Sequence, residues 1–98
     1  MRIELKKFGD TLISRQTGKE ALAAFQSTFA ELKPDEILEI DFSGVITFSP
    51  SWGDEFLTPL LNNLGDRLVL FPSDNPSIKI TIELLEKTQN KKFRLKQV

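Results

Sequence analysis

The amino-acid sequence predicts a single small α/β domain, in which helices pack on a central mixed β-sheet. Its 98 residues lie near the commonest size of one domain and suffice for one modest core. Segments with the two-residue period of strands alternate along the chain with segments that have helical spacing. This alternation is typical of a sheet built with right-handed crossovers. No repeat or flexible linker interrupts the chain, so the domain is expected to span residues 1–98.

The first two segments predict a short β-hairpin. Residues 2–8 alternate apolar and polar side chains, as in an edge strand. Gly9 and Asp10 form a turn signal, and residues 11–14 are suited to a short second strand. The chain is therefore expected to fold back on itself at its start.

The first helix is predicted to begin at Thr17 and to end before Pro34. Thr17 and Glu20 have the spacing of a capping box, in which each side chain bonds a free backbone N–H group. Pro34 cannot continue a helix. The apolar residues that recur at helical spacing in between are Leu22, Phe25, Phe29 and Leu32.

The next strand, over residues 37–42, is predicted to lie inside the sheet. Apolar residues occur on both of its faces, as expected of a strand with neighbours on either side. Ser43 and Gly44 end it. Residues 45–48 are apolar and β-prone, but Pro50 closes that stretch almost at once.

A second helix is predicted over residues 52–64, where apolar residues follow one helical face. Ser51 is expected to be its N-cap, with Asp54 at the third helical position. Pro59 lacks an N–H group and clashes one turn back, so a kink is expected there. Gly65 suits the residue that follows the last turn.

The last third of the chain contains one ambiguous segment. Residues 68–71 form a short apolar strand. Residues 77–88 fit the alternation of a strand as well as the spacing of a helix. Asn75 and Pro76, which suit the N-cap and first position of a helix, favour the helix. Residues 92–96 alternate again and predict a basic terminal strand.

The residue types that the chain lacks narrow its chemistry. It has no Cys and no His, which excludes disulfides, thiolate metal sites, cysteine nucleophiles and histidine bases. No cofactor or metal is predicted. Thirteen basic and 14 acidic residues give a net charge of −1, which argues against nucleic-acid binding. The sequence has no long apolar run and no signal peptide, so a cytoplasmic protein without membrane contact is expected.

Residues 41–55 combine features that suit a functional site. The predicted interior strand ends near Asp41, and a serine-rich loop then leads into a helix. Sites in open α/β sheets gather beyond such strand ends. The free N–H groups and the dipole at a helix start also favour a phosphate.

The same segment resembles STAS domains, the fold of anti-sigma factor antagonists. The resemblance rests on Leu38-Glu-Ile-Asp-Phe-Ser-Gly-Val45, on Ser49-Pro-Ser51 and on the helix that follows. A STAS-like family of unknown function is more similar still, with the motif strand-Asp-Phe-x-Gly-Val followed by Ser-x-Ser-aromatic-x-Asp-Glu-Phe. Phe8-Gly9 and Ile13-Ser-Arg-Gln-Thr-Gly18 look like that family's N-terminal signature. The resemblance spans nearly the whole chain in compatible order.

The resemblance implies a bacterial regulatory module without enzymatic activity. Its partner would be a GHKL-type ATPase or a serine kinase. In STAS antagonists such a kinase phosphorylates a loop serine, which aligns with Ser51. At the positions of the family's Asp and Gly this chain has Ser49 and Trp52. The residues expected at the partner surface are Phe48, Ser49, Ser51, Trp52 and Glu55, with Asp41 and Arg15 supporting the loop.

Several alternatives stay open at this level. Ser51 is either a phosphorylation site or only a helix cap, and Trp52 is either a core aromatic or an exposed interface anchor. A small Mg²⁺- or nucleotide-dependent enzyme would use Asp41, Asp54 and Glu55 as oxygen ligands. A structural subunit or a homodimer is a third possibility.

Overall fold

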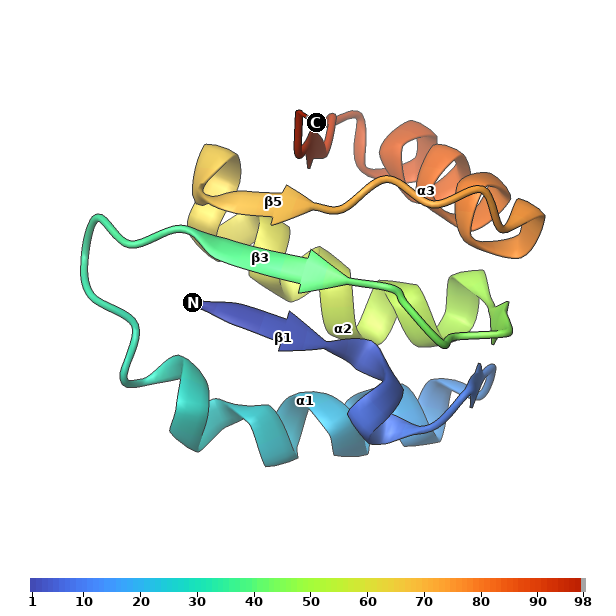
Figure 1. Cartoon of the computed structure of the whole chain (residues 1–98), viewed down its shortest axis with the longest axis horizontal. Coiled ribbons are helices and arrows are strands. Elements are labelled where there is room, and N and C mark those ends of the chain that lie inside the picture. The colour runs from blue at the N-terminus through green and yellow to red at the C-terminus, as the bar shows by residue number, and fades with distance from the viewer. Residues whose placement is uncertain (98) are drawn as a thin grey trace.

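A computed structural model describes residues 1–97 and confirms the predicted α/β class (Figure 1). Every strand pair in these residues is parallel. The main sheet has four strands in the order β1 (Arg2–Glu4), β3 (Leu38–Asp41), β5 (Leu68–Leu70) and β6 (Arg94–Leu95). A separate two-stranded sheet pairs β2 (Thr11–Leu12) with β4 (Thr47–Phe48).

The helices are packed against the main sheet. They are α1 (Arg15–Phe29), α2 (Pro50–Leu64) and α3 (Pro76–Gln89), with short 3₁₀ helices η1 (Leu5–Phe8) and η2 (Gly65–Arg67). None of the helices in residues 1–97 is long and apolar enough to cross a membrane.

The strand order explains why the helices share one side of the sheet. Each connection from β1 through β3 and β5 to β6 moves one place in the same direction. Right-handed crossovers that always move in one direction place all their helices on one face. Figure 1 shows the sheet in front of these helices. The sheet residues that face them are buried in the core: Ile3, Leu38, Ile40, Leu68 and Leu70.

Two of the sequence predictions, one for a strand and one for a helix, are confirmed. β3 lies between β1 and β5, so it is an interior strand as expected for residues 37–42. Residues 77–88 belong to a helix, α3, and Asn75 caps it by accepting a hydrogen bond from the Ser77 N–H group at 2.9 Å.

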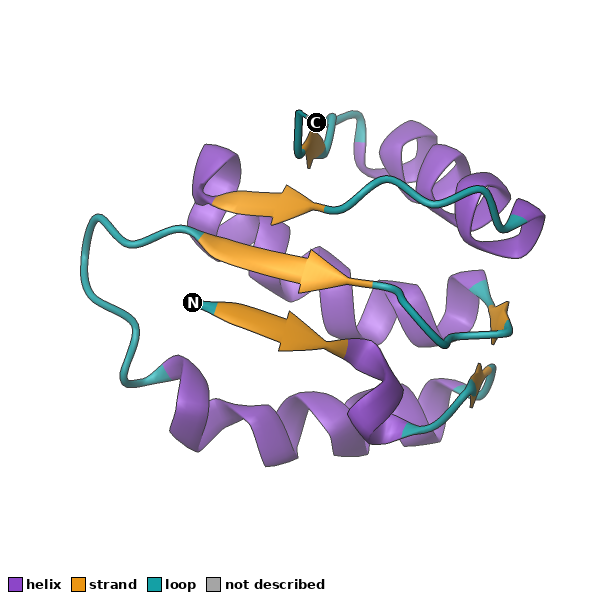
Figure 2. Cartoon of the chain, in the orientation of Figure 1, coloured by secondary structure: helices purple, strands orange, loops and turns teal. Residues whose placement is uncertain are grey.

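The predicted N-terminal hairpin is wrong. β1 ends at Glu4, and Leu5, which is fully buried, begins the 3₁₀ helix η1. This turn carries the chain away from β1. As a result β2 pairs with β4, in a register that places Thr11 opposite Thr47. Figure 2 shows this small pair standing apart from the main sheet.

The first helix begins two residues earlier than predicted. α1 starts at Arg15, because Ser14 is its N-cap and accepts a hydrogen bond from the Thr17 N–H group at 3.1 Å. Thr17 therefore lies inside the first turn and does not cap the helix. A hydroxyl side chain does cap α1, as predicted, but the residue is Ser14, three positions before Thr17.

The second helix is one continuous segment that includes Pro59. It begins at Pro50, not at residue 52, and Gly65 ends it as predicted, with a φ of 57°. A proline inside a helix removes one backbone hydrogen bond. Pro59 itself is exposed.

Candidate functional site

All three α-helices begin at one end of the molecule, beside the small β2–β4 sheet (Figure 2). β3 and β5 point their carboxyl ends towards the same end. Each helix begins with a polar N-cap, and these caps are Ser14, Ser49 and Asn75. The loops of this end therefore lie where ligand and partner sites of α/β sheets gather.

Ser49, not Ser51, caps α2. The Ser49 hydroxyl accepts a hydrogen bond from the Trp52 N–H group at 3.2 Å and donates one to the Ile13 carbonyl at 2.6 Å. Pro50 occupies the first helical position, where its missing N–H group costs nothing. Ser51 is then the second residue of the helix and is half-buried. The prediction that Ser51 is the N-cap is wrong.

Ser49→Ala is expected to lower the free energy of unfolding by about 1 kcal/mol, because the first turn of α2 loses its cap. The link to Ile13 is lost in the same variant. Urea denaturation followed by circular dichroism measures the change. Ser51→Ala is the matched control and should change stability by less than about 0.5 kcal/mol. A larger loss in Ser51→Ala than in Ser49→Ala would contradict this assignment of the cap.

The start of α3 fixes the segment that leads into α2. The Asn75 side-chain amide donates to the carbonyl groups of Val45, at 3.2 Å, and Ile46, at 2.8 Å. The Ser77 hydroxyl accepts from the Phe48 N–H group at 3.2 Å, and Thr81 Oγ1 donates to the Phe48 carbonyl at 2.7 Å. Sequence reasoning found the Asn75 cap but not these long-range contacts, which no local pattern encodes.

Phe48 and Trp52 belong to the core. Their exposed fractions are 2% and 1%. The Trp52 ring stacks on Phe56 with centroids 5.0 Å apart, and Phe48 lies 5.8 Å from Trp52. The expectation that either ring fills a pocket on a partner is therefore wrong, since neither is accessible.

Two exposed isoleucines flank the small β2–β4 sheet at this end. Ile13 follows β2 and is 51% exposed, and Ile46 precedes β4 and is 64% exposed. Sequence reasoning missed both as surface residues, because each lies in a short β-prone run, 11–14 or 45–48, whose pattern does not show which side chains stay exposed. Together with Pro50 and Ser51 they form the docking end, the name used below for these four residues.

Arg15 ties the first turns of α1 and α2 together. Its Nη1 donates to Asp54 at 2.9 Å and to Glu55 at 2.8 Å. The bonds to Glu55 and Asp54 raise the pKa of Arg15 above its ordinary value. Arg15 therefore supports the start of α2 by holding two carboxylates.

Asp41 lies in a separate ion pair at the end of β3. It is 4% exposed and accepts hydrogen bonds from the Ser43 N–H group at 2.9 Å and the Ser43 hydroxyl at 2.7 Å. Arg2 pairs with its other oxygen. Burial raises the pKa of Asp41, but the bonds from Arg2 and Ser43 outweigh burial and hold the pKa below its usual value. The residue supports the loop that begins at Ser43.

The carboxylates of the alternative enzyme site do not gather. Asp41 is paired with Arg2, whereas Asp54 and Glu55 are paired with Arg15. No group of three or more acidic side chains in residues 1–97 could hold a metal ion. This arrangement gives no support to a Mg²⁺ site at these three residues.

Asp41 makes stability depend on pH. Its pKa is lower in the folded state, so ionised Asp41 stabilises the fold above the unfolded pKa of about 3.9. That contribution is lost as the pH falls through the lower, folded pKa. Asp41→Asn should therefore lose stability less steeply than the wild type as the pH falls towards that region. Urea midpoints at a series of pH values test this, and identical slopes for the two proteins would contradict it.

Comparison of the chain with family models, curated proteins and solved structures finds no match in any of the three. The geometry of residues 1–97 therefore has to carry the assignment of function. The docking end includes two exposed isoleucines and a half-buried serine. Arg15 pairs with both neighbouring carboxylates, Asp54 and Glu55, which leaves this group with one net negative charge. Such a surface is suited to binding a protein.

Proposed function

We propose that this protein is a non-enzymatic regulatory module, similar to STAS anti-sigma factor antagonists, that binds a GHKL-type ATPase or a serine kinase at its docking end. The exposure of Ile13 and Ile46 carries the proposal. Burial of large apolar side chains is the main favourable term in protein association. The hydrogen bonds of Ser49 and Asn75 hold the backbone of both isoleucines in place before binding, which reduces the entropy lost on association.

Ser51 is the proposed site of regulation. It lies in the first turn of α2, where free N–H groups and the helix dipole favour a phosphate. Asp54 and Glu55 follow it by three and four residues, so they share its helical face and repel a phosphate. These opposing effects leave the stability of the domain nearly unchanged. A partner that covers the docking end would have to desolvate the added charge, so phosphorylation releases it.

The binding part of the proposal is tested with the two exposed isoleucines. Ile13→Ser and Ile46→Ser are each expected to weaken binding of the kinase or ATPase at least about tenfold, measured by titration calorimetry. Leu95→Ser is the matched control, because Leu95 is 53% exposed and lies on β6, away from the docking end. Equal affinities for the control and both isoleucine variants would overturn the proposed surface.

The regulatory part is tested by incubation with the kinase and ATP, followed by mass spectrometry. Phosphate is expected on Ser51 and absent from a Ser51→Ala variant. Ser51→Asp should bind the partner more weakly while unfolding at nearly the same urea concentration as the wild type. If an active kinase leaves Ser51 unmodified and both variants bind normally, Ser51 has only a structural role.

A further inference from the structure

One edge of the main sheet has no neighbouring strand. β1 pairs with β3 on one side, and no strand in residues 1–97 pairs with its other side. The Glu39 N–H group donates to the Met1 carbonyl at 2.8 Å. Backbone groups of successive residues point in opposite directions along a strand, so Ile3 bonds to β3 while Arg2 and Glu4 turn their N–H groups outward.

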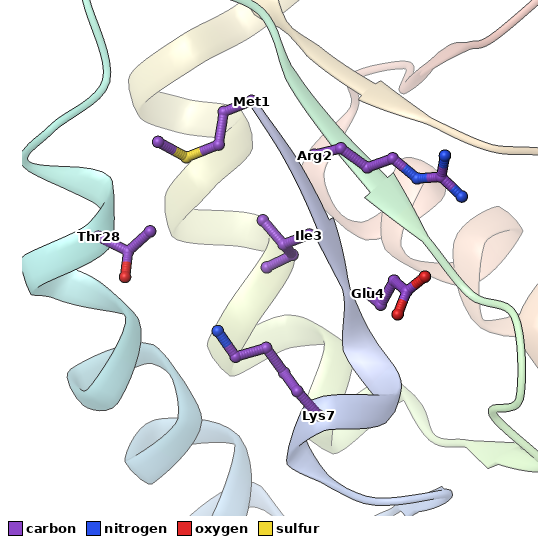
Figure 3. A pocket seen from close by; sticks show the side chains of 6 residues that line it. All are labelled: Met1, Arg2, Ile3, Glu4, Lys7 and Thr28. Carbon is purple, nitrogen blue, oxygen red and sulfur yellow. The ribbon is translucent and has the colours of Figure 1, made fainter.

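A groove of about 420 Å³ runs along this open edge, between β1 and α1. Its lining residues are Met1, Arg2, Ile3, Glu4, Lys7 and Thr28. Figure 3 shows the side chains of Met1, Ile3, Lys7 and Thr28 pointing into the gap, while Arg2 and Glu4 point away from it. The groove therefore has apolar side chains on its β1 wall and a lysine at one end.

The helix layer extends further than the sheet on this side. α1 lies beyond the β1 edge in Figure 1, and α2 lies behind β1. A strand added to β1 would therefore have helices beneath it, as the other strands of the main sheet do. It would also satisfy the outward N–H groups of Arg2 and Glu4, which an exposed edge leaves to water.

We propose that the β1 edge binds an extended segment of a partner protein as an added strand. The segment would carry apolar residues at alternate positions, facing the groove, because side chains alternate along a strand. An acidic residue would lie at the end near Lys7. The Lys7 ammonium is 5.5 Å from the centre of the Phe8 ring, and no salt bridge in residues 1–97 uses it. This surface is separate from the docking end.

A second copy of the chain fits this edge less well. Pairing β1 with the β1 strand of another copy would bring two α1 helices into the same space, because each extends past its own sheet edge. The space beneath two paired β1 edges has room for the α1 helix of only one copy. A segment without its own helix layer avoids this conflict.

The test uses the full chain and acetylated peptides of sequence Val-Thr-Val-Thr-Val with Asp or Lys at either end. Amide hydrogen exchange by NMR should show new protection at Arg2 and Glu4, and no change at Ile3, whose N–H group already faces β3. N-methylation of the peptide residues that face β1 should weaken binding about fivefold for each lost hydrogen bond. Methylation of the alternate residues should have no such effect.

Two variants separate backbone pairing from charge. Glu4→Pro removes an outward N–H group, and it should lose peptide binding that Glu4→Ala retains. Because proline also has to shift φ from −100° towards about −65°, the N-methylated peptides test the same hydrogen bonds without a change to the protein. Lys7→Glu should reverse the preference from peptides that end in Asp to those that end in Lys. Circular dichroism shows whether each variant is folded.

Three results would overturn the proposal. The first is that none of the peptides binds the wild type. The second is that Glu4→Pro binds as well as Glu4→Ala. The third is protection of Arg2 and Glu4 that rises with protein concentration in the absence of peptide, which would mean that a second copy occupies the edge.

Discussion

Replacing Trp52 with alanine is expected to lower the free energy of unfolding by about 3–5 kcal/mol. Trp52 is 1% exposed and lies at the centre of an aromatic cluster. Its ring is 5.0 Å from Phe56, 5.8 Å from Phe48 and 6.1 Å from Phe8, measured between ring centroids. Alanine removes the apolar surface of the indole and leaves a cavity that the neighbouring rings cannot fill without moving.

The loss is measured by urea denaturation followed by far-UV circular dichroism, because Trp52 is the only tryptophan and its fluorescence disappears with it. Domains of this size are stable by about 5–15 kcal/mol, so Trp52→Ala removes a large part of the total. Trp52→Phe keeps an aromatic ring and should lose clearly less. Ser51→Ala, at the adjacent half-buried position, should remain within about 0.5 kcal/mol of the wild type. A loss below about 1 kcal/mol for Trp52→Ala would show an accessible side chain and restore the interface-anchor interpretation.

The α/β class and the interior strand could be predicted because both depend on periodicity. Leu38, Ile40 and Phe42 alternate along residues 37–42 and are buried, which marks a strand with one face on the core. Its two edges pair with β1 and β5, so the strand is interior. The apolar Ile37, which favoured that prediction from the other face, is itself 38% exposed. Asn75 and Pro76 favoured the helix over residues 77–88, and in the structure Asn75 caps α3 with Pro76 in its first turn. Each of these signals is local and has one physical meaning.

The N-terminal hairpin could not be excluded from the sequence, because its competitor is a long-range pairing. Gly9 ends η1 and Asp10 is a bend. β2 then pairs with β4, in which Thr47, opposite Thr11, lies thirty-six residues later in the chain. Burial of Leu5 in η1 favours pairing of β2 with β4 over pairing with β1. This burial exists only once the core has assembled, so the local sequence does not encode it.

The helix caps illustrate a different limit. Both α1 and α2 have two hydroxyl residues near their start, Ser14 and Thr17 in one case and Ser49 and Ser51 in the other. Either residue of each pair could be the N-cap, because Ser and Thr are both preferred there. That preference does not show at which residue the backbone changes from extended to helical. For α2 the sequence did hold the answer. Pro50 is favoured at the first helical position, which makes Ser49 the cap.

The candidate site differs from its sequence prediction more than the fold does. The spacing of apolar residues does not show which of them stay exposed on the surface of the folded protein. Trp52 and Phe56 are four residues apart, on the stripe that α2 turns to the core, so their burial follows from the helix itself. Ile13 and Ile46 lie outside regular strands, and their exposure depends on how β2 and β4 meet. The link from Arg15 to Asp54 and Glu55 likewise requires the packed pair of helices.

Gly18→Ala is expected to lower the free energy of unfolding by about 1–3 kcal/mol, although alanine is the better helix former. Gly18 lies in α1 where that helix crosses α2. A Cβ atom there would lie 2.9 Å from the Trp52 carbonyl oxygen and 3.1 Å from the Trp52 Cα. Both are backbone atoms, so α1 would have to move away from α2, and the bonds from Arg15 to Asp54 and Glu55 would stretch.

Gly53→Ala provides the matched comparison within α2. The nearest atoms to an added Cβ there belong to side chains, at 3.0 Å for Leu85 and 3.2 Å for Phe48 and Thr81. Side chains can shift by a few tenths of an ångström at less cost than a helix backbone, so Gly53→Ala should lose less stability than Gly18→Ala in the same urea titration. A stabilising Gly18→Ala variant would mean that helix propensity outweighs the clash. That result would imply that α1 and α2 are not in close backbone contact at Gly18. The bonds from Arg15 to Asp54 and Glu55, which need this contact, would then not support the docking end.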